Sequence, residues 1–193
     1  MFIKDWKKEI FTIPNLLSLF RLALIPVYMY IYMNATEPNQ YFTAAAILAV
    51  SCLTDAIDGK IARHFNMIST VGKILDPLAD KFTQLALTFC LAQKYPILNP
   101  VLVLFLVKEI FQLVVGAINL RKGKMLPGAL LAGKVCTTVL FISLITLVLL
   151  PNLNSRIVDA IALVDSVFLV ISFVSYFFAY FGKNTKVQDL ETK

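Results

Sequence analysis

The sequence predicts an all-helical integral membrane protein with six transmembrane helices and an N-terminal amphipathic surface helix. Of its 193 residues, 59% are hydrophobic and 16% are charged, and the mean hydropathy is +0.77. Soluble domains average about 45–50% apolar and about 25% charged residues, so this chain is too apolar for water. The three cysteines are odd in number and lie within apolar runs, which argues against a secreted disulfide framework. The composition also excludes a basic nucleic-acid-binding protein.

Six apolar stretches are long enough to span a bilayer, which takes about 20 helical residues. Lengths near this value, without sustained polar and apolar alternation, favour helices over a transmembrane barrel. The segments between them contain the Pro, Gly and Asn residues typical of turns. We expect the spans at residues 14–33, 41–63, 73–95, 97–119, 133–150 and 157–181.

The two ends of the chain differ from this six-helix domain, which we expect at residues 13–182. Residues 1–12 interleave apolar and charged side chains and include Trp6, as in an amphipathic helix lying on the membrane surface. The charges reach Glu9 and no small-residue cleavage site follows, so the segment does not resemble a signal peptide. Residues 183–193 form a polar tail.

The distribution of basic residues predicts the orientation of the chain. Lysine and arginine cluster before the first span, around the 2–3 and 4–5 connections, and after the sixth span. The opposite loops contain only Lys94 and Arg156. The positive-inside rule therefore places both termini in the cytoplasm of a cell membrane. The net charge of +6 reflects this topology and attraction to anionic membrane lipids.

Four aspartates lie near the cytoplasmic ends of the second and third spans. Asp55 and Asp58 are spaced i, i+3, and Asp76 and Asp80 are spaced i, i+4, so each pair shares one helix face. The short connection predicts antiparallel neighbouring helices with both pairs at the same depth. Four carboxylates in a low-dielectric site repel unless cations neutralise them. Oxygen ligands of this kind suit Mg²⁺, Mn²⁺ or Ca²⁺ rather than zinc.

Residues between the aspartates suit a phosphate ligand. Gly59 and Ala62 leave space for a close approach, and Arg63 offers a bidentate fork to phosphate oxygens. Gly72 opens the third span, where Lys73 and the positive helix end favour an anion. A buried charge network that only holds helices together would leave these small residues and the excess of acids unexplained.

Residues 55–80 follow the pattern D-x-x-D-G-x-x-A-R-x8-G-x3-D-x3-D without a departure, and this pattern resembles the signature of the CDP-alcohol phosphatidyltransferase family. The resemblance implies a homodimer with a cytoplasm-facing site for two ions, Mg²⁺ or Mn²⁺. It implies transfer of a phosphatidyl group from CDP-diacylglycerol to an alcohol, with release of CMP. The roles that it implies are metal binding by the aspartates, with Asp80 also the catalytic base, and binding of the CDP-lipid by Asp55, Gly59, Ala62, Arg63 and Gly72.

The acceptor alcohol is less clearly specified. Residues 13–21 and Gly133-Lys134 are similar to phosphatidylglycerophosphate synthases, which use glycerol 3-phosphate. Those enzymes commonly have Arg-Glu and a second Arg where this chain has Lys108-Glu109 and Gly116. Residues 126–134 also resemble cardiolipin synthases, whose acceptor is phosphatidylglycerol. We favour glycerol 3-phosphate, keep phosphatidylglycerol, inositol phosphate and serine as alternatives, and expect acceptor contacts from Lys73, Lys108 and Lys134.

Two other classes of protein are less consistent with the sequence. Membrane prenyltransferases also place aspartate pairs around Mg²⁺, but they are longer and lack the Gly59, Ala62 and Arg63 set. A cation-coupled membrane transporter would often show inverted repeats and charges near the bilayer midplane. This chain has no visible repeat, and its clustered acids lie toward one end of their spans.

Overall fold

The computed structural model describes residues 13–64, 72–122, 124–125, 130–182 and 188–189. Their side chains are described except those of residues 13–14, 38, 52, 55–64, 72–74, 124–125 and 188–189. The chain divides into two compact units, residues 1–90 and 91–193. The long helices are α2 (Ile13–Met33), α3 (Pro38–His64), α4 (Gly72–Lys94), α5 (Asn99–Arg121), α6 (Leu131–Leu149) and α7 (Ser155–Phe181).

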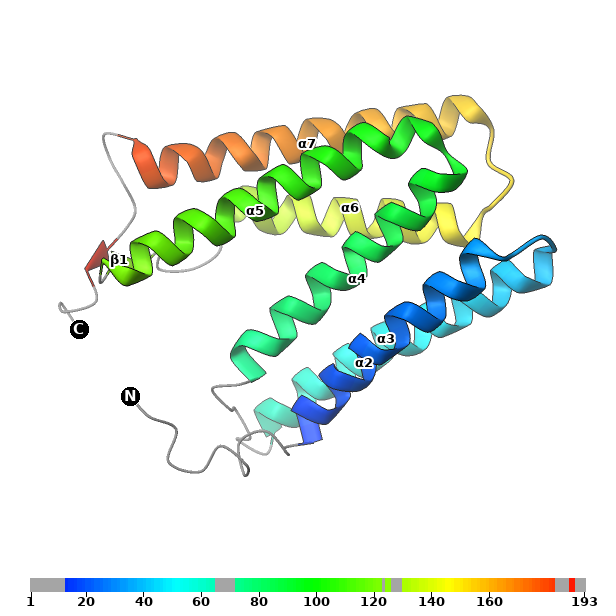
Figure 1. Ribbon diagram of the computed structural model, residues 1–193, viewed down its shortest axis with the longest axis horizontal. Helices are drawn as coiled ribbons and strands as arrows, with labels where there is room; N and C mark the ends of the chain where they lie inside the picture. Colours follow the sequence, from blue (N-terminus) through cyan, green and yellow to red (C-terminus); the bar gives the residue numbers. More distant parts are fainter. Residues whose placement is uncertain (1–12, 65–71, 123, 126–129, 183–187, 190–193) are drawn as a thin grey trace. The chain divides into compact units, whose positions relative to one another are not determined.

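The first unit consists of α2, α3 and most of α4. α2 and α3 pack closely along their lengths, and α4 runs back in the direction opposite to α3 (Figure 1). The buried face of α2 begins with the polar residues Asn15, Ser18 and Arg21 and continues with Tyr28 and Tyr32. Because these positions recur every three or four residues, they lie on one side of the helix. This unit therefore carries a polar half and an aromatic half on the same helix face.

A short turn between α2 and α3 follows Met33. The side-chain oxygen of Gln40 accepts hydrogen bonds from the backbone N–H groups of Thr36, at 2.6 Å, and Glu37, at 3.1 Å. The ring of Tyr32 stacks on Tyr28 and meets Tyr41 edge-on, with ring centroids 5.6 and 5.4 Å apart. These contacts fix the end of the helix pair opposite Asn15.

The second unit is built from α5, α6 and α7, preceded by the short 3-10 helix η1 (Pro96–Leu98). α7 packs against both α5 and α6. The core of the second unit contains leucines from α6 and α7. The ring centroids of Phe111 and Phe173 lie 4.9 Å apart. Two short strands, β1 (Lys124–Met125) and β2 (Gln188–Asp189), pair in antiparallel fashion in this unit. The sequence did not predict this pairing.

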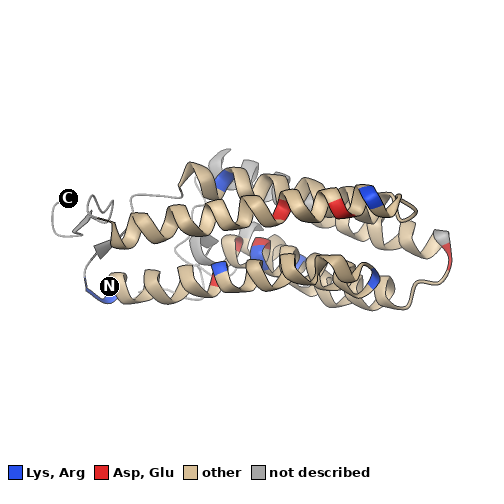
Figure 2. Cartoon of the chain, turned by 90° about the horizontal axis from the view of Figure 1, so that it is seen from above, with Lys and Arg blue, Asp and Glu red and all other residues tan. Residues whose placement is uncertain are grey.

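The helix positions expected from hydropathy agree with the structure to within a few residues. Pro96 and Pro100 mark the break between α4 and α5, as the turn chemistry predicted. Few charged residues lie along the described helices (Figure 2). The expected amphipathic helix at 1–12 lies outside the described residues, and so does most of the polar tail at 183–193.

Four of the described helices are long and apolar enough to cross a membrane: α2, α5 with η1, α6 and α7. α3 and α4 carry the charges of the aspartate motif within their length, and this lowers their mean hydropathy. The structure and the composition together indicate a multi-pass membrane protein. The prediction of six spans is therefore supported for four helices and stays a prediction for α3 and α4.

Candidate functional site

Two of the four predicted aspartates are held by side chains of α2. The hydroxyl of Ser18 donates a hydrogen bond of 2.5 Å to Oδ1 of Asp76. One turn further along, Nη1 of Arg21 donates to Oδ1 of Asp80, also at 2.5 Å. Because both partners advance by one helical turn together, α2 and α4 run in the same direction at this contact.

The donors on α2 are more deeply buried than the Asp80 carboxylate on α4. Ser18 is fully buried and Arg21 is 2% exposed, whereas the side chain of Asp80 is 52% exposed. A buried guanidinium is costly unless hydrogen-bond acceptors face it, and an anionic acceptor stabilises it most. Asp80 supplies that charge while its carboxylate remains accessible. The site thus has a closed, basic side on α2 and an open, acidic side on α4.

The other predicted ligands can be placed by their backbone alone. Asp55 and Asp58 lie in the last three turns of α3, together with Gly59, Ala62 and Arg63, and α3 ends at His64. Gly72 is the first residue of α4, and Lys73 follows it. These residues' side-chain contacts lie outside the described part of the chain. In the sequence, seven residues separate the end of α3 from the start of α4.

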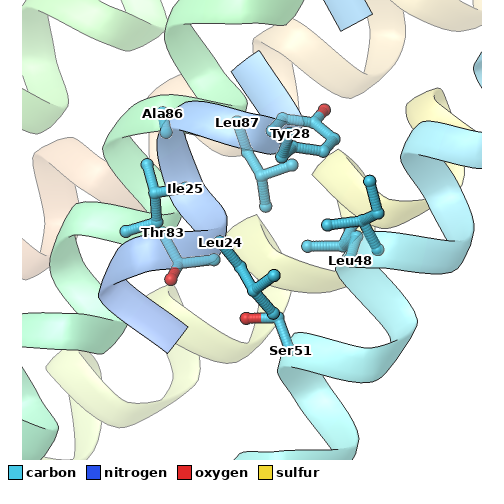
Figure 3. A pocket seen from close by; sticks show the side chains of 9 residues that line it. Leu24, Ile25, Tyr28, Leu48, Ser51, Thr83, Ala86 and Leu87 are labelled. Atoms are coloured by element: carbon cyan, nitrogen blue, oxygen red, sulfur yellow. The ribbon is translucent and has the colours of Figure 1, made fainter. Parts of the chain in front are cut away.

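An apolar crevice lies further along the same helices, one turn beyond Arg21 and Asp80 (Figure 3). Side chains from α2, α3 and α4 turn toward one another there and line a small, partly open crevice. Leu24 lies one turn beyond Arg21, and Thr83 lies one turn beyond Asp80. The ion pair is therefore backed by apolar surface, where charge interactions are stronger than in water. The lining consists of Leu24, Ile25, Tyr28, Ile47, Leu48, Ser51, Thr83, Ala86 and Leu87.

The predicted acceptor residues of the second unit differ in their surroundings. Lys108 is 2% exposed, and its Nζ forms an ion pair of 2.5 Å with Oε1 of Glu109. The same ammonium lies 5.9 Å from the centre of the Phe105 ring. Lys134 is exposed in the first turn of α6, where the positive end of the helix dipole favours anions. Of these two lysines, Lys134 is the one open to a ligand.

Sequence analysis assigned no role to Ser18 or Arg21. Arg21 was recognisable as a charged residue within an apolar span, which is a signal for function. Ser18 lies three residues before it and therefore on the same face. Their partners are 58 and 59 positions away in the chain, and spacing within one helix could not identify them.

The carboxylate oxygens of the motif are the donor type that suits a hard divalent cation, although among the residues whose side chains are described no three acidic, histidine or cysteine side chains gather into one cluster. Asp76 and Asp80 offer carboxylate oxygens from one face of α4, and Asp55 and Asp58 are spaced i, i+3 near the end of α3. Oxygen-only donor sets of this kind are preferred by Mg²⁺ and Mn²⁺. Ser18 and Arg21 each donate to one oxygen of the two α4 carboxylates.

Comparison with known proteins identifies similar sequences. The family model for CDP-alcohol phosphatidyltransferases matches residues 11–178. The chain is 32% identical to a CDP-diacylglycerol–glycerol-3-phosphate 3-phosphatidyltransferase of Aquifex aeolicus over 172 residues, covering 85% of this chain and 93% of that protein. It is 33% identical to a cardiolipin synthase (CMP-forming) of Streptomyces coelicolor over 131 residues, covering 67% of this chain and 61% of that protein.

A further relative is a CDP-diacylglycerol–glycerol-3-phosphate 3-phosphatidyltransferase of Escherichia coli. The two chains are 42% identical over 71 residues, which covers 37% of this chain and 38% of the relative.

Proposed function

We propose a specific reaction for this chain, which belongs to the CDP-alcohol phosphatidyltransferase family and is an enzyme of phospholipid biosynthesis. The reaction is transfer of a phosphatidyl group from CDP-diacylglycerol to the primary hydroxyl of glycerol 3-phosphate, with CMP as the second product. The observation that carries this proposal is the placement of Asp76 and Asp80 on one face of α4, within a signature that contains no departure from the family pattern.

Different residues of the signature would have different roles in this transfer reaction. Asp80 accepts the proton of the acceptor hydroxyl as the acceptor oxygen bonds to the phosphatidyl phosphorus, and the phosphorus–oxygen bond to CMP breaks. Its 52% exposed side chain makes this proton transfer sterically feasible. Gly59, Ala62, Arg63 and Gly72 line the site of the CDP group, and Asp55 contributes to it. No covalent intermediate on the protein is required for this direct displacement.

Asp55, Asp58, Asp76 and Asp80 would hold two divalent cations, Mg²⁺ or Mn²⁺. When bound, the cations supply positive charge that neutralises the diphosphate and the leaving CMP. The oxygen-only donors of α4 support this assignment. We further propose that the site and both termini face the cytoplasm, on the basis of the basic loops, and that two copies form a homodimer.

For the acceptor, glycerol 3-phosphate is supported by the long match to the Aquifex aeolicus protein. Lys134, and less directly Lys73 and Lys108, would contact the acceptor phosphate. One observation favours a second candidate: the charge of Lys108 is already balanced by Glu109. A weaker cationic pocket suits phosphatidylglycerol, the acceptor expected of a cardiolipin synthase, and the Streptomyces coelicolor match agrees with this alternative.

The test supplies purified full-length protein in lipid nanodiscs with CDP-diacylglycerol and Mg²⁺. Glycerol 3-phosphate, phosphatidylglycerol, inositol phosphate and serine are added in parallel, and CMP and the lipid product are measured. We expect CMP release coupled to phosphatidylglycerophosphate formation. Cardiolipin formation would select the second candidate, and ion flux without CMP release under any condition would overturn the assignment.

A further inference from the structure

We propose that Ser18 and Arg21 are positioning residues of the catalytic centre, which orient the carboxylates of Asp76 and Asp80 from α2. This inference rests on the proposed function, because it assigns the two residues to the metal ligands and the general base of that reaction. It extends the site beyond the signature at residues 55–80. The contacts that carry it are the hydroxyl of Ser18 on Asp76 and the guanidinium of Arg21 on Asp80.

The geometry is specific to these two pairs. Ser18 and Arg21 are spaced i, i+3 on α2, and Asp76 and Asp80 are spaced i, i+4 on α4. Because the two helices run in the same direction here, each donor meets one carboxylate at the same helical level. Both donors are buried, so water does not compete for them. A carboxylate held by a buried donor has less freedom to rotate, and this lowers the entropic cost of binding or reacting in one orientation.

The two contacts have different chemical consequences. The hydroxyl of Ser18 is neutral and fixes one oxygen of Asp76 without changing the charge of the site. The guanidinium of Arg21 holds its positive charge beside Oδ1 of Asp80. This charge offsets part of the repulsion among the acidic residues. Because the Asp80 side chain is 52% exposed, this pairing leaves the carboxylate accessible to an acceptor. Ser18 should therefore affect cation binding, and Arg21 should affect turnover.

The apolar crevice begins one turn beyond the second contact. Leu24 and Thr83 follow the Arg21–Asp80 pair by one turn on their respective helices, in a space lined mainly by apolar side chains. Charge interactions next to such a surface are less screened than those in water. A guanidinium also presents a rigid planar fork, which a lysine ammonium does not reproduce. We therefore expect Arg21→Lys to keep the charge and lose the orientation.

The experiment compares purified full-length Ser18→Ala, Arg21→Lys and Arg21→Leu variants with wild type. Ser172→Ala is the matched control for Ser18→Ala, since Ser172 is also fully buried but lies on α7 without a carboxylate contact in the described residues. Arg156→Lys, at an exposed position, is the control for Arg21→Lys. Mn²⁺ binding is measured by electron paramagnetic resonance without CDP-lipid, kcat and KM by CMP release, and stability by the thermal midpoint.

Ser18→Ala should weaken Mn²⁺ binding by about tenfold, the effect of losing a hydrogen bond to a charged group, and should regain wild-type kcat at saturating Mn²⁺. Arg21→Lys should lower kcat by about tenfold while the KM for CDP-diacylglycerol and the Mn²⁺ affinity stay near wild type. Arg21→Leu should lower kcat further without weakening Mn²⁺ binding.

Wild-type Mn²⁺ affinity in Ser18→Ala, or wild-type kcat in Arg21→Lys, would overturn the corresponding role. A lowered thermal midpoint with unchanged Mn²⁺ affinity and kcat would assign the residues to folding alone and would also overturn the inference. If Arg21→Leu does not fold, Arg21→Lys still decides the role of Arg21. Absence of CMP release by wild type would instead refute the proposed function, a result that the variants do not affect.

Discussion

A Cβ atom placed on Gly133 would lie 2.6 Å from the hydroxyl oxygen of Tyr176 and 2.8 Å from its ring carbon Cε2. The backbone N–H of Leu130 donates to the same hydroxyl at 3.3 Å. Tyr176 therefore packs directly against the first turn of α6, and only glycine at position 133 permits this approach. The contact fixes the backbone that carries Lys134.

Gly133→Ala should destabilise the protein, because the added methyl group overlaps the ring of Tyr176. Overpacking of this kind costs about 1–3 kcal/mol, measured here as a lower thermal midpoint in detergent. Gly116→Ala is the matched control: its Cβ would lie 3.6 Å from the Tyr180 hydroxyl oxygen, an ordinary contact. A Gly133→Ala midpoint at or above that of Gly116→Ala would contradict the tight packing.

Asp80→Asn should abolish CMP release while the protein still folds and inserts. The amide keeps the size of the carboxylate but cannot accept the acceptor's proton, and loss of a general base costs about 10²–10⁴-fold in rate. Single-turnover CMP release measures the effect, with Asp159→Asn at an exposed position of α7 as control. Normal turnover by Asp80→Asn would remove its assignment as the base.

Chelation of divalent cations should stop the reaction. EDTA treatment is expected to eliminate CMP release, and excess Mg²⁺ or Mn²⁺ should restore it, because the clustered carboxylates need neutralisation to accept a diphosphate. The measurement is the initial rate against free metal concentration. Undiminished activity in stringently metal-free buffer would contradict the proposed two-cation site.

Lys134→Ala should raise the apparent KM for the acceptor more than that for CDP-diacylglycerol. Losing a charge-assisted hydrogen bond to phosphate is expected to cost about tenfold in acceptor affinity. Lys122→Ala, an exposed lysine just after α5, serves as control. The reverse pattern, with a larger effect on the CDP-lipid, would place Lys134 outside the acceptor pocket.

Asp165→Leu should raise the thermal midpoint without lowering activity. Asp165 is 1% exposed; the Ser143 side chain interacts with it, but neither carboxylate oxygen accepts a hydrogen bond of ordinary geometry from the described residues. A buried polar group without a partner is costly, and an apolar side chain of similar size removes that cost. Asp159→Leu makes the same change at an exposed site of α7 and should leave the midpoint unchanged. A large loss of stability in Asp165→Leu would show that the carboxylate is paired.

The positions of the helices were predictable because each long apolar stretch has one physical solution in a bilayer. Pro96 and Pro100 gave the break between α4 and α5 from backbone sterics alone. Which side of a helix faces the protein core was harder to predict, because all sides of these helices are apolar. Asp165 lies in an apolar span whose sequence does not indicate which side is buried, and the structure shows it facing the core of the second unit.

The part of the candidate site that depends on residue spacing within one helix was predictable. Asp76 and Asp80 share a face because they are one turn apart, and that relation needs no tertiary structure. The partners Ser18 and Arg21 depend on how α2 docks beside α4, at sequence separations of 58 and 59 residues. The ion pair of Lys108 with Glu109 likewise depends on side-chain conformation, because adjacent residues on a helix do not face one another.

The parallel course of α2 and α4 has a consequence for anyone who would transplant this catalytic motif into a designed bundle. A fragment starting at residue 38 retains every residue of the signature yet leaves Asp76 and Asp80 without the hydroxyl and guanidinium that hold them. A graft that keeps these two contacts must therefore include α2, running parallel to α4 and at the same height along it.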